Sequence, residues 1–261
     1  METTVFTIEK FDIKLDTNWI GRNFLFIEEL DSTNSFLLDK KNEISTDGTV
    51  LLAEKQNKGR GRFDRQWYST KGQNLTFSIL LTKTASFGRS INLLNLGSSV
   101  VVAQTIENLF QLKPELKWPN DVLINGKKIS GILLESVSSG NKMIKLVVGI
   151  GVNVNQTIFQ GQYNIQPTSI KHEYGQFIER EKLLAELLNN YEGMLYKLKS
   201  DPDSILKEWR KSCKLIGEKI SVIQLEETKH GIFEDIDDEG YLLLKSKNGI
   251  EKISFGDVSV Y

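Results

Sequence analysis

The sequence has few of the residues that build disulfide frameworks and zinc centres. Among its 261 residues there is one cysteine, Cys213, and there are two histidines, His172 and His230. A single cysteine excludes an intrachain disulfide, and two histidines argue against a histidine-rich zinc site. We interpret the cysteine as a buried apolar side chain rather than a nucleophile. Its isolation fits a reducing compartment, so we expect a cytoplasmic protein.

The sequence also lacks an excess of positive or negative charge. Lysine and arginine number 33 against 34 aspartate and glutamate, which gives a formal net charge of -1. No global field therefore points to nucleic acid or to an anionic membrane. The N-terminus lacks the basic head and apolar run of a signal peptide, and no apolar run is long enough to span a bilayer. With 39% hydrophobic and 26% charged residues, the composition is typical of a soluble protein of one or two domains.

Basic residues are instead concentrated in one short segment, Lys55 to Trp67. Arg60, Arg62 and Arg65 supply planar guanidinium groups that match phosphate or carboxylate, and the glycines between them let the main chain approach a ligand. A solvated charge run or a non-specific nucleic-acid arm has the same composition. On its own, the segment leaves both interpretations open.

Apolar patterning predicts that this segment joins two core strands. Residues 49–54 and 74–82 are expected to be buried strands, and residues 21–30 a third. A short strand is expected at 4–9, and an amphipathic helix at 91–112. Loops between strands of a rigid scaffold often hold ligands, which favours a binding role for the arginines.

The middle of the chain predicts a hairpin and a glycine-containing strand. Asn125-Gly126 between two apolar runs indicates a type I′ turn that pairs residues 122–124 with 129–135. The strand expected at 145–155 contains Gly149 and Gly151, which indicate either tight packing or ligand contact. Residues 24–155 therefore predict a mostly antiparallel sheet with at least two helices, an α+β arrangement.

The last third of the chain changes character near residue 216. A polar loop is expected at 156–176, followed by helices at 179–199 and 204–213. Short strands then follow at close spacing, which is typical of a small antiparallel barrel. They are expected at residues 219–223, 230–236, 241–245 and 252–255. We expect two domains, 1–214 and 215–261.

Short polar side chains, Asp31-Ser32-Thr33-Asn34, directly precede the apolar Phe36-Leu37-Leu38. This order is the signature of a helix N-cap. The alternative is that these hydroxyl and amide groups line a polar pocket at a strand-to-helix turn, where main-chain N–H groups are also exposed. The local sequence leaves both open.

Four motifs together carry a resemblance to the biotin–protein ligases, that is, biotin–[acetyl-CoA-carboxylase] ligases, over Phe26 to Tyr261. Any one of them is weak, but four in order at fitting spacing are specific. They are Asp31-Ser32-Thr33-Asn34; Gly59-Arg60-Gly61-Arg62 with Arg65 and Trp67; Lys117-Trp118-Pro119-Asn120-Asp121 followed by Lys128-Ile129-Ser130-Gly131-Ile132-Leu133-Leu134-Glu135; and Gly149-Ile150-Gly151-Val152-Asn153.

The resemblance implies a fold and a reaction. The fold would be α+β, a mixed, mostly antiparallel sheet with flanking helices like that of class II aminoacyl-tRNA synthetases, plus a small C-terminal Src-homology-3-like β-barrel. The enzyme would use ATP to convert biotin to biotinyl-5′-AMP, with Mg²⁺ as cofactor. It would then transfer the biotinyl group to a lysine of a biotin carboxyl carrier protein or domain. Neither DNA nor a membrane is an expected partner, and an oligomer is left open.

The resemblance also implies site residues. Lys128, Arg62 and Asp121 would be catalytic, with Asp121 orienting or deprotonating the acceptor lysine. Biotin would contact Ser32, Thr33, Asn34, Gln56, Arg60, Gly61, Arg62, Lys128 and Gly131. ATP or the adenylate would contact Arg60, Arg62, Arg65, Trp67, Asn120, Lys128 and Asn153, and Trp67 would cover the ligand. Mg²⁺ would lie near Asn120 and Asp121.

Two features depart from the family pattern. Many members have Arg-Gly after the second arginine of the loop, where this chain has Phe63-Asp64, so loop ordering and adenylate retention are in question. About 25 residues precede the first motif, fewer than the winged helix-turn-helix of the repressor members needs. We therefore expect a short form without an N-terminal DNA-binding domain.

Two other functions are alternatives to a biotin–protein ligase. A lipoate or octanoate ligase shares the fold and the adenylate chemistry, but the GRGR loop and the Lys-Trp-Pro-Asn-Asp run favour the biotin branch. A non-enzymatic module, such as a biotin-sensing repressor or an RNA-binding protein, would use the basic loop alone. The lack of a recognition helix and the near-neutral charge weigh against it.

Overall fold

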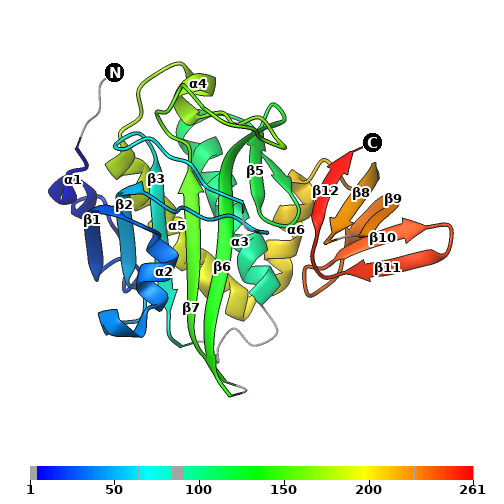
Figure 1. Cartoon of the computed structure of the whole chain (residues 1–261), viewed down its shortest axis with the longest axis horizontal. Coiled ribbons are helices and arrows are strands. Elements are labelled where there is room, and N and C mark those ends of the chain that lie inside the picture. Colours follow the sequence, from blue (N-terminus) through cyan, green and yellow to red (C-terminus); the bar gives the residue numbers. More distant parts are fainter. Residues whose placement is uncertain (1–4, 64, 84–90, 141, 226, 261) are drawn as a thin grey trace.

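The computed structural model of the chain describes residues 5–63, 65–83, 91–140, 142–225 and 227–260, so Asp64 of the Phe63-Asp64 departure lies outside the described residues. Two sheets, of seven and five strands, dominate the fold (Figure 1). Within the described ranges, no helix is long and apolar enough to cross a membrane.

The elements have the following bounds. The helices are α1 (Ile8–Asp12), α2 (Thr33–Leu38), the 3-10 helix η1 (Lys40–Asn42), α3 (Ile91–Phe110), α4 (Ile170–Tyr174), α5 (Arg180–Ser200) and α6 (Pro202–Ser212). The strands of the larger sheet are β1 (Phe24–Leu30), β2 (Val50–Gln56), β3 (Leu75–Leu81), β4 (Glu115–Lys117), β5 (Asp121–Ile124), β6 (Lys127–Ser139) and β7 (Lys142–Val152). Those of the smaller sheet are β8 (Lys219–Gln224), β9 (Glu227–Ile236), β10 (Leu242–Ser246), β11 (Gly249–Ile253) and β12 (Asp257–Val260).

The larger sheet has the order β1-β2-β3-β7-β6-β5-β4. Only its β1–β2 pair is parallel, which confirms the expected mixed, mostly antiparallel α+β fold. The turn between β5 and β6 has φ values of 51° at Asn125 and 72° at Gly126, as the type I′ hairpin requires. This hairpin brings the two halves of the Lys117-to-Glu135 motif onto neighbouring strands.

Side chains from both faces of the larger sheet are buried. Val50 and Leu52 of β2 point into a core shared with α3, α5 and α6, which lie behind the sheet in Figure 1. Leu51, between them, packs with Leu37 of α2 in a smaller core on the opposite face. Burial on both faces explains why β2 and β3 are apolar runs rather than alternating strands. The face that carries α2, called the front face below, also carries the candidate site.

The smaller sheet is antiparallel, with the order β11-β10-β9-β8-β12. It packs on the rest of the molecule through Phe233, whose ring lies 6.4 Å from that of Trp209 in α6. The indole N–H of Trp118 also donates to the Gly240 carbonyl at 3.1 Å. The antiparallel sheet is confirmed, whereas its Src-homology-3-like barrel form and the domain boundary at 214/215 stay predictions.

The strand expected at 4–9 is wrong where the chain is described. Residues 5–7 have no regular structure and α1 begins at Ile8. The N–H of Phe6 donates to Glu54 Oε1 at 3.1 Å, and that of Thr7 donates to Glu181 Oε1 at 2.8 Å. Because carboxylates satisfy these main-chain donors, the segment needs no partner strand.

The remaining differences are short elements. The polar loop expected at 156–176 contains α4, whose N-cap Ser169 accepts a hydrogen bond from the N–H of His172 at 3.2 Å. No strand is predicted for β4 or β12, because three or four residues show too little alternation to be recognised. The fourth short strand begins at Gly249 rather than at residue 252.

Candidate active site

Three glycines form a bare patch at the centre of the front face. Gly131 of β6 pairs with Gly151 of β7, and Gly149 pairs with Leu133. A Cβ on Gly151 would lie 2.4 Å from the Trp67 ring, and one on Gly149 would lie 2.4 Å from Asn34 Oδ1. Tight packing is therefore confirmed for Gly149 and Gly151, since each makes room for a side chain that lines the cavity, and contact with a ligand stays a prediction.

A cavity of about 540 Å³ lies over this patch. Every residue that the sequence proposes for the site lines it. These are Ser32, Thr33, Asn34, Gln56, Arg60, Gly61, Arg62, Arg65, Trp67, Asn120, Asp121, Lys128, Gly131 and Asn153. The described lining residues include five cationic side chains, those three arginines with Lys117 and Lys128, against the carboxylates of Asp121 and Asp257. The excess positive charge suits an anionic ligand.

The arginine segment, residues 59–63 and 65–67, is ordered by its own main chain. The N–H of Gly61 donates to the Arg65 carbonyl at 2.7 Å, and that of Trp67 donates to the Gly59 carbonyl at 2.9 Å. Phe63 holds φ at 52°, in the left-handed region that glycine adopts more readily. Its ring lies 4.8 Å from the guanidinium carbon of Arg62, so this departure from the family pattern packs on a site arginine.

Two arginines of this segment are anchored by the smaller sheet. Asp257 of β12 pairs with Arg65 at 2.6 Å and with Arg62 at 3.5 Å. Arg62 also donates to the Gly256 carbonyl at 3.1 Å. Burial lowers the pKa of Arg62 from its usual value, and the charges of Asp257 and Asp121 oppose that shift. The end of the chain at Gly256 and Asp257 therefore anchors the arginine segment.

We predict that Asp257→Asn loosens the segment in the ligand-free protein. Losing the anion removes a charge-assisted hydrogen bond, and the rate of tryptic cleavage after Arg62 and Arg65 should rise on the order of tenfold. Limited digestion followed by mass spectrometry measures that rate. Asp238→Asn, at an exposed position of the turn before β10, is the matched control. Equal cleavage in both variants would contradict the anchoring role.

Lys128 extends over the edge of the glycine patch. Its Nζ lies 2.6 Å from Asp121 Oδ1 and 5.9 Å from the centre of the Trp67 ring. A Cβ on Gly131 would lie 3.2 Å from this Nζ. Nearby, burial lowers the pKa of Lys117 from its usual value, an effect that the charges of Asp121 and Asp257 oppose. Two ammonium groups, those of Lys128 and Lys117, therefore belong to residues that line the cavity.

Trp67 covers Gly131 and Gly151 of the glycine patch, and Asn120 and Asn153 also line the cavity. The indole Nε1 of Trp67 is buried without a hydrogen-bond partner in the described part of the chain, so a ligand acceptor would satisfy it. Asn120 donates to the Ile132 carbonyl at 2.6 Å and turns its Oδ1 toward Arg62, 3.5 Å away. The N–H of Asn153 donates to the Ile129 carbonyl at 2.9 Å.

The polar cluster before α2 serves both roles that the sequence leaves open. Ser32 is the N-cap and accepts from the N–H of Ser35 at 3.4 Å. Thr33 and Asn34 are buried beside it and line the cavity. Gln56 Oε1 accepts from the N–H of Thr33 at 2.7 Å, which joins the end of β2 to the start of α2.

Three charged residues in or beside the cavity have no role predicted from the sequence: Lys117, Glu135 and Asp257. Lys117 begins the Lys117-to-Glu135 motif, but the spacing of that motif does not show that its side chain lines the cavity. Glu135 ends the same motif and pairs with Arg60 at 2.8 Å. Asp257 follows Gly256 in a short strand and carried no recognisable signal. Each becomes part of the site only through the pairing of distant segments.

Comparison with known proteins assigns the family. Residues 26–153 match the pattern of the Biotin/lipoate A/B protein ligase family, and residues 215–261 match that of the Biotin protein ligase C terminal domain. The chain belongs to this ligase family. It is 32% identical to the bifunctional ligase/repressor BirA of Bacillus subtilis over 249 residues, covering 94% of this chain and 76% of that protein.

Two further comparisons lie within the biotin branch. The biotin–[acetyl-CoA-carboxylase] ligase of Paracoccus denitrificans is 32% identical, over 87% of this chain and 96% of that one. The structure of the biotin protein ligase from Aquifex aeolicus in complex with biotin and ATP is 30% identical, with a TM-score of 0.81. That match covers 92% of this chain and 99% of the other.

Proposed function

We propose that the cavity over the glycine patch is where this chain, an ATP-dependent biotin–protein ligase, forms biotinyl-5′-AMP. The same site would then transfer the biotinyl group to a lysine of a biotin carboxyl carrier protein or domain. The observation that carries the assignment is that one cavity is lined by Lys128, by the polar side chains of Ser32, Thr33 and Asn34, and by the three arginines. Relatives in the biotin branch support the substrate.

Biotin is proposed to bind with its ureido ring at the polar cluster. A ureido group has two N–H donors and one carbonyl acceptor, and it suits short uncharged partners. Ser32, Thr33, Asn34 and Gln56 provide hydroxyl and amide groups there, and Arg60 and Gly61 provide main-chain groups. The valerate carboxylate would then point along the glycine patch toward Lys128.

Adenylation brings two anions together. A carboxylate oxygen of biotin attacks the α-phosphorus of ATP, a new O–P bond forms, and the bond to the bridging oxygen breaks as pyrophosphate leaves. Lys128 and Arg62 would lower the barrier by neutralising the charge that gathers at the α-phosphate. Arg65 would hold the leaving phosphates, and phosphate binding would displace the contacts of both arginines with Asp257. Asn120 and Asn153 would complete the nucleotide site.

Transfer uses the same cavity. The ε-amine of the acceptor lysine attacks the biotinyl carbonyl, an amide bond forms, and AMP leaves with the bonding electrons. Asp121, which lies 2.6 Å from the ammonium of Lys128, is the carboxylate proposed to orient or deprotonate that amine. Trp67 and the arginine segment would keep water from the mixed anhydride, which hydrolyses readily.

The donor set fits a magnesium ion that arrives with ATP rather than one resident in the protein. Among the residues the structure covers, no group of three histidine, cysteine, aspartate or glutamate side chains could hold a metal. Mg²⁺ commonly uses one or two carboxylates together with substrate phosphates. Asp121 and the Oδ1 of Asn120 are the oxygens proposed to hold it. When bound, the ion would offset phosphate charge.

The proposal extends to organisation and location. The catalytic domain would comprise residues 1–214 and the small domain residues 215–261, with the smaller sheet in the latter. The proposed location is the cytoplasm, and the buried position of Cys213 agrees with a thiol that stays reduced there. Burial raises the pKa of this thiol to about 11, which leaves it unreactive as a nucleophile.

Incubation with biotin, MgATP and a carrier domain is expected to add one biotinyl group to a single carrier lysine, detected by mass spectrometry. Omitting ATP should abolish the addition, because the carboxylate is not activated. Lipoate in place of biotin is the matched control, since it tests the other branch of the family. Modification by lipoate and not by biotin would overturn the proposal.

A further inference from the structure

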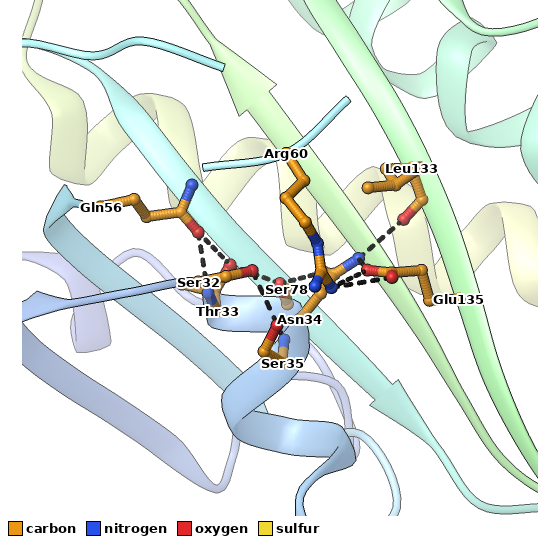
Figure 2. A network of polar contacts seen from close by, with 9 residues as sticks. All are labelled: Ser32, Thr33, Asn34, Ser35, Gln56, Arg60, Ser78, Leu133 and Glu135. Atoms are coloured by element: carbon orange, nitrogen blue, oxygen red, sulfur yellow. Dashed lines mark hydrogen bonds and ion pairs between the residues drawn. The ribbon is translucent and has the colours of Figure 1, made fainter. Parts of the chain in front are cut away.

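We propose that Glu135 is a positioning residue that fixes the direction of the hydrogen bonds in the biotin pocket. The inference rests on the proposed function of that pocket. Glu135 stands at one end of a continuous chain of polar contacts that runs through the polar cluster to Gln56 (Figure 2). It lies outside the cavity lining, so it acts through other side chains.

Glu135 joins the two walls of the pocket. Its Oε2 accepts from Asn34 Nδ2 at 2.8 Å, which reaches it from the start of α2. Its two carboxylate oxygens accept from Arg60 Nη2 at 2.8 and 3.0 Å, which reaches it from the arginine segment. The guanidinium of Arg60 is thereby directed at a protein carboxylate. The carboxylate of Glu135 therefore orients the side chains of both Asn34 and Arg60.

The ionised carboxylate fixes the orientation of the Asn34 amide. A carboxylate only accepts hydrogen bonds, and so does the Leu133 carbonyl, which lies 3.1 Å from the same Asn34 nitrogen. The NH₂ end of Asn34 must therefore face β6. Its Oδ1 then faces the hydroxyl of Ser78, 2.6 Å away.

The orientation is passed on through two hydroxyl groups. Because Asn34 Oδ1 has no proton, the hydroxyl of Ser78 donates to it. Ser78 Oγ also lies 2.6 Å from Thr33 Oγ1, to which it could donate only if its one proton were free. Because that proton goes to Asn34, we infer that Thr33 donates to Ser78 and not to its other acceptor, Gln56 Oε1 at 3.0 Å. Gln56 Oε1 is held by the main-chain N–H of Thr33 instead.

The consequence is a pair of acceptors at the far end of the chain. Thr33 Oγ1 and Gln56 Oε1 both present lone pairs, and an N–H donor between them would satisfy both. A ureido N–H is such a donor. If the Asn34 amide turned over, every hydroxyl proton would point the other way and Thr33 would donate to Gln56. Glu135 therefore favours the state of the pocket that accepts a ureido N–H.

The first test is Glu135→Gln, with the unaltered protein beside it. Losing the anion weakens the bias on Asn34, and calorimetry should give a biotin affinity lower on the order of tenfold. The Leu133 carbonyl still favours the same orientation, so binding is reduced and not abolished. The KM for biotin should rise by more than the rate of pyrophosphate release at saturating biotin falls, because saturation overcomes a loss that is confined to biotin binding. Glu29→Gln, which removes an exposed ion pair of the same sheet, is the matched control.

The second test is a double-mutant cycle with Asn34→Asp. Alone, this change puts two carboxylates against each other and should weaken biotin binding more than Glu135→Gln does. Combined with Glu135→Gln, the new carboxylate accepts from both Ser78 and the new amide, so binding should recover relative to Asn34→Asp alone. A role in folding alone predicts losses that add.

The positioning role of Glu135 and the assignment of the biotin pocket fail on different results. Unchanged biotin affinity in Glu135→Gln, or strictly additive losses in the cycle, would overturn the positioning role while the pocket assignment stands. Absence of biotin binding by the unaltered protein would instead overturn the proposed function.

Discussion

Lys128→Ala is expected to lower the rate of biotin-dependent pyrophosphate release by a factor of about 10² to 10³, the usual effect of removing one group that stabilises developing charge. The ammonium is the cation at the glycine patch, and its loss also leaves Asp121 facing the incoming carboxylate. Two like charges would then meet in a partly buried site. Pyrophosphate release measured at saturating biotin and MgATP reports the effect.

The neighbouring Lys127→Ala is the matched control, because that side chain is exposed in the same hairpin. It should leave the rate unchanged. The fold of Lys128→Ala should persist, since the main chain of residue 128 keeps its bonds to Gln166 and Thr168. A rate equal to that of the unaltered protein would remove Lys128 from the mechanism.

Glu54→Gln is expected to lower the free energy of unfolding by about 3–5 kcal/mol, the range found when one partner of a buried ion pair is removed. The side chains of Glu54 and Arg180 are 4% and 1% exposed, and their two contacts are both 2.8 Å. The substitution leaves the guanidinium buried beside a neutral amide. Chemical denaturation followed by circular dichroism measures the change.

Glu115→Gln is the comparison, because its partner Lys214 is largely exposed. Exposed pairs contribute less than about 1 kcal/mol, so this variant should unfold close to the unaltered protein. The buried pair also ties the N-terminal segment to the sheet, because Glu54 accepts from the N–H of Phe6. Equal free energies of unfolding for the two variants would show that the buried pair stabilises the fold no more than the exposed pair does.

Much of the fold could be predicted from local patterns. The type I′ turn at Asn125-Gly126 needs only the conformational freedom of two residues, and the long helices need only apolar spacing. The segment before α1 could not be predicted, because its donors are satisfied by Glu54 and Glu181, which lie far along the chain. Local alternation has no access to such partners.

The candidate site divides in the same way. Its glycines, arginines and Lys128 stand in motifs, so the residues could be named before their arrangement was known. The sequence could not show which polar groups of the site contact one another. Asn34 and Glu135 are 101 positions apart, and Arg62 contacts Gly256 across 194 positions. Those pairings depend on strand order and on the packing of the second sheet.

The attachment of strand β12 to the arginine segment has a consequence for protein engineering. A chimera that exchanges only residues 215–261 would keep every motif of the larger sheet and still change the contacts that Arg62 and Arg65 make with Asp257. Designs that replace this segment should therefore retain an aspartate at the position of Asp257. The rest of this segment could be varied, provided that Asp257 still contacts Arg62 and Arg65.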